Sequence, residues 1–224
     1  IVIVGDTNGT GLVASISESL TNEDLTERDI SRLPVPTVAL DREERIETAN
    51  RRQSAMVYGT VGPQLSHRDR LPLIVIENVL SGLGGRLFET IREQQGLAYT
   101  VRVFDSFLSR SGAFFAYTAF SPENEAQVRS SLEAEIARLV EAGITDEELV
   151  RAVNYSVGAH EISLQTRRGR TLAFARAVIA GDGMELVTEF GESIRQVTRD
   201  QVRAIAVKYL SPSLAKIAIL RGQE

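Results

Sequence analysis

Two side chains, Arg92 and Tyr99, are of types that can donate hydrogen bonds to carbonyl oxygens. They lie seven positions apart in the sequence. A guanidinium can donate several hydrogen bonds to peptide carbonyls. A phenol can donate a hydrogen bond to the negative oxygen that develops on a scissile carbonyl. The spacing alone favours structural roles, in which Tyr99 is a half-buried aromatic of a strand and Arg92 stabilises the C-terminal end of a helix.

The residues around this pair predict a loop, a short helix and a strand. Leu87 and Ile91 have the spacing of one apolar helical face, and Gly96 is typical of a helix end. An alternating pattern follows, which predicts a strand with Tyr99 and Val101 on the same face. The loop before the helix contains three glycines, which allow positive φ or a close backbone approach: Gly82, Gly84 and Gly85.

The composition excludes several classes of protein. An apolar share of 43% over 224 residues is enough for a core that needs no disulfides. The absence of cysteine excludes a disulfide framework and a thiolate zinc site. A net charge of −5 gives no support to nucleic-acid binding. No apolar run is long enough to predict a membrane span.

The histidines do not form a hydrolytic zinc motif. Such a site needs His-x-x-Glu-His or His-Glu-x-x-His on a helix, so that two imidazoles share a face and a carboxylate acts as base. The chain has two histidines, His67 and His160, far apart in sequence. His160 is followed by Glu161, but Leu164 occupies the position of the second histidine. We therefore expect no metal site in this chain and interpret both histidines as packing or surface residues.

The chain divides into three predicted parts. Residues 1–32 contain a β-branched strand, Ile1–Val4, and a helical stretch, and we interpret them as the end of a preceding domain. Residues 33–50 are polar and contain two prolines, which is typical of a linker. Residues 51–224 form one complete domain. A chain that begins within a strand is expected to be a piece of a longer protein.

Within residues 51–224, groups of strands and helices alternate irregularly, which predicts an α+β fold: an antiparallel sheet with helices packed on one face. Ser121 followed by proline predicts a helix start. Thr145 with Glu148, and Thr198 with Gln201, have the spacing of capping boxes. The remaining predicted elements are strands 51–62, 101–107, 111–120 and 216–220 and a helix over 68–80.

The central segment resembles the signature of the non-zinc-binding C-terminal domain of pitrilysin-like peptidases, the family of insulinase and the mitochondrial processing peptidase. In that family a glycine-rich loop leads into an Arg-Leu-Phe helix, and an Arg and a Tyr lie across Gly-Leu-Ala-Tyr. Here these elements are residues 81–88, Arg92 and residues 96–99. The similarity extends over nearly the whole chain, and the central segment is its most specific part.

The resemblance implies a function in peptide hydrolysis. Tyr99 would stabilise the tetrahedral intermediate and Arg92 would hold the substrate backbone. Zinc would be bound by a complementary domain or subunit of the same family, so we do not expect this chain to be active alone. The loop would contact the peptide substrate through a further set of candidate residues: Gly82, Gly84, Gly85 and Arg86. A tight corner between two helices explains the same loop equally well. A structural clamp that only closes the substrate chamber is the alternative.

Weaker alternatives stay open. The loop Gly5–Gly11 follows a strand but lacks the spacing of a nucleotide-binding motif. The basic cluster Arg167–Arg170 is interpreted as a solvated face. The stretch Gln53–Thr60 is a candidate edge strand for peptide addition. The strand Ile1–Val4, without its own sheet, could pair with a second copy and give a homodimer. The sequence does not choose between bacterial periplasm and cytoplasm.

Overall fold

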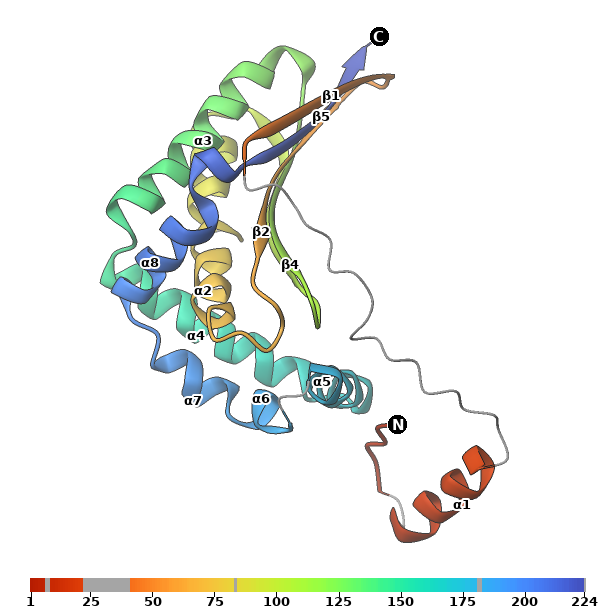
Figure 1. Cartoon of the computed structure of the whole chain (residues 1–224). Coiled ribbons are helices and arrows are strands. Elements are labelled where there is room, and N and C mark those ends of the chain that lie inside the picture. Colours follow the sequence, from red (N-terminus) through yellow and green to blue (C-terminus); the bar gives the residue numbers. More distant parts are fainter. Residues whose placement is uncertain (7–8, 22–40, 83, 181–182, 224) are drawn as a thin grey trace.

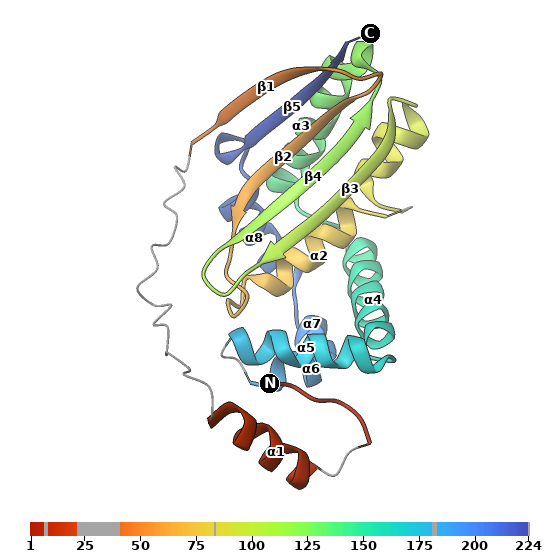
Figure 2. The same ribbon diagram turned by 90° about the vertical axis from the view of Figure 1, so that its right-hand side faces the viewer.

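The centre of the protein is a five-stranded sheet with the strand order β1-β5-β2-β4-β3 (Figures 1 and 2). The structure is a computed structural model that describes residues 1–6, 9–21, 41–82, 84–180 and 183–223. The strands are β1 (Glu43–Asn50), β2 (Ser54–Gly62), β3 (Ala98–Phe107), β4 (Gly112–Phe120) and β5 (Lys216–Gln223).

The sheet is mixed. Strands β1 and β5 pair in parallel, whereas β5 with β2, β2 with β4, and β4 with β3 are antiparallel. The prediction of an α+β fold is confirmed, and the expected antiparallel sheet differs at this one pair. The parallel pair joins strands from opposite ends of the domain, so no local turn signal could have revealed it.

Helices cover one face of the sheet, and no described helix packs against the other face (Figure 1). Apolar side chains of the sheet and of this helical layer form one continuous core. No helix among the described ranges combines the length and the apolarity that a bilayer crossing needs. The helices in chain order are α1 (Gly9–Thr21), α2 (Arg70–Leu80), the π-helix η2 (Phe88–Gln94), the 3₁₀ turn η3 (Pro122–Asn124), α3 (Glu125–Ala142), α4 (Asp146–Ser163), α5 (Arg167–Ala180), α6 (Glu185–Thr188), α7 (Phe190–Arg195), α8 (Arg199–Leu210) and the 3₁₀ turn η4 (Pro212–Leu214).

The helix starts follow the capping chemistry of the sequence in two places. In the Thr145–Glu148 box and the Thr198–Gln201 box, each threonine hydroxyl accepts from the N3 backbone, and each N3 side chain accepts from the N-cap N–H. Both predictions are confirmed. Ser121 makes no capping hydrogen bond, and a 3₁₀ turn separates it from α3. Its hydroxyl instead contacts another strand, as described below.

Three boundary predictions differ from the structure. Ile1–Val4 is not assigned as a strand, because no described neighbour pairs with it. Glu43–Asn50, at the end of the expected linker, forms β1. The candidate edge strand Gln53–Thr60 overlaps β2, which lies between β4 and β5 in the sheet and pairs with both, so it is not an edge strand. Residues 33–40 of the expected linker and residues 7–8 of the glycine loop lie outside the described residues, and the division into three parts stays a prediction.

Candidate functional site

The candidate site is built on the turn from η2 into β3. Gly96 ends η2 with a φ of +64°, a conformation that glycine adopts without strain. The N–H of Leu97 donates to the carbonyl of Ile91 at 2.9 Å, which closes the turn. The wider winding of a π-helix is frequent at functional sites. The predicted helix and its glycine end are therefore confirmed, with η2 being a π-helix.

A β-bulge decides where Tyr99 points. The pairing of β3 with β4 shifts between Ala98 and Thr100, so Tyr99 is an extra residue in the ladder. Ala98 and Val101 are both buried, whereas 55% of the surface of Tyr99 is exposed. The prediction that Tyr99 shares a face with Val101 is wrong, because the extra residue reverses the alternation at this point. Bulges of this kind re-aim side chains next to active sites.

The phenol of Tyr99 has one described partner. Its hydroxyl lies 3.0 Å from Oγ of Ser121, and either oxygen can be the donor. Ser121 directly follows β4, the neighbour of β3 in the sheet. The amide of Asn124 donates to the carbonyl of Leu97 at 3.1 Å and ties the same turn to η3. Sequence reasoning missed both residues as supports of the site, because their partners are distant in sequence.

Arg92 lies in the last turn of η2 and is exposed. Its guanidinium carbon is 5.1 Å from the centre of the Phe88 ring, a cation–π distance. Arg92 also lines a hollow of about 610 Å³ beside β3, whose lining does not include Tyr99. The structure thus places both residues at the surface on either side of the Gly96 turn, with the side chain of Arg92 in the hollow and that of Tyr99 outside it.

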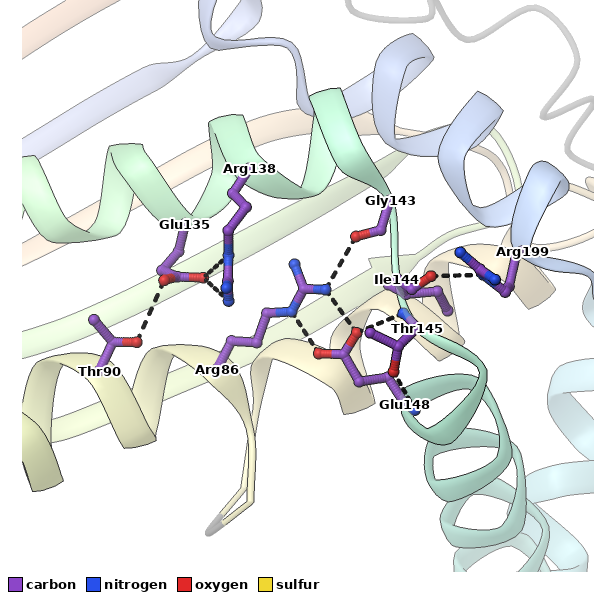
Figure 3. Close-up of polar contacts among 9 residues, drawn as sticks. All are labelled: Arg86, Thr90, Glu135, Arg138, Gly143, Ile144, Thr145, Glu148 and Arg199. Carbon is purple, nitrogen blue, oxygen red and sulfur yellow. Dashed lines mark hydrogen bonds and ion pairs between the residues drawn. The ribbon is translucent and has the colours of Figure 1, made fainter.

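Arg86 is buried and bound inside the protein (Figure 3). Its Nε and Nη2 atoms each donate to one carboxylate oxygen of Glu148 at 2.6 Å, and Nη2 also donates to the carbonyl of Gly143 at 3.0 Å. Burial alone would raise the pKa of Glu148, but the hydrogen bonds from Arg86 and from the Thr145 N–H hold it below its usual value. Arg86 therefore joins the start of η2 to α4, and its guanidinium faces inward.

The glycine loop needs its glycines for two different reasons. Gly82 has a φ of +77°, which a side chain would strain. At Gly85 a side chain would collide with the backbone carbonyl of Ser81, whereas Gly84 faces open space. The loop is therefore tightly folded at one end and open at the other. A smaller hollow of about 220 Å³ lies between the open end and α4, and Gly82 and Gly84 both line it.

The two histidines have structural contacts. Nδ1 of His67 accepts a hydrogen bond from the N–H of Asp69 at 3.1 Å. Nε2 of His160 lies 2.9 Å from the carbonyl of Val187, and its ring packs against Phe190. Within the described ranges, no group of three or more His, Cys, Asp or Glu side chains could hold a metal ion.

Comparisons with known proteins identify the family. Residues 1–155 match the model of the peptidase M16 inactive domain. An uncharacterized zinc protease of Streptomyces coelicolor is 28% identical over 185 residues, which are 80% of this chain and 40% of that protein. The solved peptidase M16 inactive domain from Pseudomonas fluorescens is 16% identical with a TM-score of 0.84, over 99% of this chain and 52% of that one. A Helicobacter pylori protease, also at 16% and 0.84, is covered over 53% of its length by 97% of this chain.

This chain thus spans about 40% of its Streptomyces relative and about half of the two solved chains. The matching family model names the domain inactive, and the resemblance noted in the central segment is confirmed. The chain belongs to the M16 peptidase family and is its inactive domain.

Proposed function

We propose that this chain is the non-metal-binding half of a zinc metallopeptidase and that it supplies Tyr99 and Arg92 to a zinc site on another domain or subunit. The phenol of Tyr99 donates a hydrogen bond to the oxyanion of the tetrahedral intermediate. The guanidinium of Arg92 donates to backbone carbonyls of the bound peptide. Zinc, held by the complementary half, supplies the Lewis acid and the activated water.

The outward position of Tyr99 carries this proposal. A strand with regular alternation would turn the ring toward the helical layer, and the bulge at Ala98 turns it to the surface instead. Among the described residues, Ser121 alone forms a hydrogen bond with the Tyr99 hydroxyl. A phenol can both donate and accept, so the Tyr99 hydroxyl can form a second hydrogen bond, and it can donate that bond when Ser121 is the donor of the first. Arg92 is likewise exposed and has no described carboxylate partner.

Fewer residues of the glycine loop are in a position to meet the substrate than the sequence predicted. Gly82 and Gly84 border a hollow and are open to an approaching peptide backbone. Gly85 is packed against the chain, and the Arg86 guanidinium is engaged with Glu148. We therefore propose Gly82 and Gly84 as the substrate-facing residues of the loop, with Gly85 and Arg86 as their support.

The test is peptidase activity with zinc, measured on this chain alone and after addition of the zinc-binding half. We expect no activity alone and activity on mixing. Tyr99→Phe should then lower kcat by about 10²-fold or more, the usual effect of losing one oxyanion donor. Arg92→Ala should lower kcat/KM mainly through a higher KM, because Arg92 holds the substrate in both the ground and the transition state.

Tyr209→Phe is the matched control, because the Tyr209 hydroxyl donates to Asp69 at 2.9 Å and lies on α8. The substitution Tyr209→Phe removes a hydrogen-bonded hydroxyl outside the candidate site and should leave the activity of the mixture unchanged. Equal activity with Tyr99→Phe, Arg92→Ala and wild type would favour the structural clamp. Activity of this chain by itself would overturn the proposal.

A further inference from the structure

A second binding feature lies along the free edge of β3. This strand ends the sheet, so its outer backbone groups pair with no described strand. The hollow of about 610 Å³ runs beside it. Ser81 and Gly82 of the loop and Phe88 and Arg92 of η2 line the side that faces residues 100–104 of β3.

The hydrogen bonding of β3 shows which backbone groups face the hollow. The N–H of Val103 donates to Oγ of Ser81 at 3.4 Å, outside the sheet. Since backbone groups alternate sides along a strand, the N–H and C=O of Val101 point to the same free edge. An extended peptide laid in the hollow could therefore pair with Val101 and, with a small shift of the weakly bound Ser81, with Val103.

The two edges of the sheet differ in protection. β1, the other edge, has the sequence Glu-Glu-Arg-Ile-Glu over residues 43–47, and these residues are exposed. Charges on an edge strand discourage pairing with another chain. β3 has no such row of charges from Val101 to Phe104 apart from Arg102, and no proline. Its edge is open to strand addition where that of β1 is blocked.

Two arginines give the hollow its chemistry. Arg92 from η2 and Arg102 from β3 both line it and are exposed. Neither has a carboxylate partner among the described residues, although acidic side chains outnumber basic ones in the chain, 30 to 25. Some other surface arginines are paired with a carboxylate, such as Arg129 with Glu44 and Arg221 with Glu125. Two free guanidinium groups at one edge favour a carboxylate ligand.

We propose that β3 binds an extended peptide as an added strand and that Arg92 and Arg102 select an acidic side chain of that peptide. The backbone of Val101 gives affinity without regard to sequence, and the two guanidinium groups give the preference for Asp or Glu. This inference rests on the proposed function, since it names the class of peptide that the site takes. Arg102 is a specificity residue that the sequence did not reveal.

The experiment measures binding of labelled peptides to this chain by fluorescence anisotropy, without the zinc-binding half. The probes are short peptides of alternating Val and Thr. They are made in pairs that carry one Glu or one Gln at the same position, and that position is moved along the peptide from pair to pair. We expect the Glu peptide to bind about tenfold more tightly in the best register, because a charge-assisted hydrogen bond contributes roughly that factor. Arg102→Gln should bring the Glu-to-Gln ratio close to one.

Arg168→Gln is the matched control, because Arg168 is exposed on α5 and the substitution changes the net charge equally. It should keep the ratio. Arg102→Lys should give an intermediate Glu-to-Gln ratio, since lysine keeps the charge but lacks the planar guanidinium that can donate two hydrogen bonds to one carboxylate. Circular dichroism checks that each variant is folded. An unchanged ratio in folded Arg102→Gln, or equal loss in Arg168→Gln, would overturn the acidic preference.

Strand addition has its own probe. N-methylation of alternate peptide nitrogens removes the donors that β3 would need and should weaken binding in one of the two methylation registers only. Equal binding of both methylated peptides would overturn the added strand. The proposed function is tested by Tyr99→Phe in the complemented peptidase. Each can therefore fail while the other stands.

Discussion

Arg86 and Arg92 lie six positions apart on one segment, and the fold uses them in opposite ways. Arg86 is 9% exposed and holds Glu148 through two hydrogen bonds of 2.6 Å. Arg92 is exposed, and its one described contact is the ring of Phe88. A buried charge must be paired and hydrogen-bonded, whereas an exposed one is solvated by water. The difference separates a structural arginine from one that is free to meet a ligand.

The largest expected loss of stability comes from replacing Arg86, the buried arginine of the two. Arg86→Ala leaves the Glu148 carboxylate buried without its counter-ion and should lower the free energy of unfolding by about 3–5 kcal/mol. Urea denaturation followed by circular dichroism measures this change. Glu148→Gln should cost a similar amount, and the double variant Arg86→Met/Glu148→Leu should be less destabilised than either single variant. A wild-type unfolding midpoint for Arg86→Ala would mean that the pair does not hold η2 to α4.

A smaller loss is expected from the turn that directs Arg86 inward. A side chain at Gly85 would collide with the carbonyl of Ser81, so Gly85→Ala forces the loop to shift and should cost about 1–3 kcal/mol. Gly84→Ala is the neighbouring control, because its added methyl group meets no atom. Thermal unfolding of the two variants under the same conditions checks the difference. If both lose the same stability, the close approach at Gly85 is not the reason for the glycine.

Two partly buried carboxyl groups, those of Glu148 and Glu77, show the same contrast between a paired and an unpaired charge among the described residues. Glu148 has a guanidinium partner, whereas burial and the neighbouring Asp105 raise the pKa of Glu77 to about 9. A carboxyl whose pKa is higher in the folded state contributes stability that is complete below its unfolded pKa and is lost as the pH rises toward the folded value. The wild type should therefore lose stability between about pH 4 and pH 9 through this group.

Glu77→Gln removes this loss and keeps a hydrogen-bond donor toward Asp105. We expect the variant to unfold with a free energy about 1–2 kcal/mol higher than wild type at pH 8, and with no gain at pH 4. Urea denaturation at both pH values measures the difference. Burial raises the pKa of Asp105, Arg70 and Arg176 offset part of that rise, and all three residues remain in the variant. A gain of equal size at both pH values would show that packing, and not ionisation, separates the two proteins.

The sequence predicted those parts of the fold that depend on neighbours in the chain. The boxes Thr145–Glu148 and Thr198–Gln201 and the glycine end at Gly96 each need only a few adjacent residues. The parallel pairing of β1 was not predictable, because an exposed edge strand has no apolar alternation to reveal it. The central position of β2 depends on β5, which lies at the other end of the domain.

The site was predicted in part for the same reason. The resemblance of residues 81–99 to the family signature singled out Arg92, Tyr99 and the glycines, and their catalytic and substrate roles remain proposals. The bulge that turns Tyr99 outward depends on the register between β3 and β4, and no residue type in the sequence predicts that register. The partner of Arg86 is 62 positions away, so the sequence could not separate a buried arginine from an exposed one.

The smallest effect on stability is expected at Arg92. Its contact with the Phe88 ring is exposed to water and contributes about 0.5–1 kcal/mol, so Arg92→Ala should change the free energy of unfolding by no more than that. The same urea titration as for Arg86→Ala measures it. A small stability change together with a large rise in KM of the complemented peptidase would assign Arg92 to the substrate. A loss as large as that of Arg86→Ala would instead make Arg92 a structural residue, and the two arginines would no longer differ.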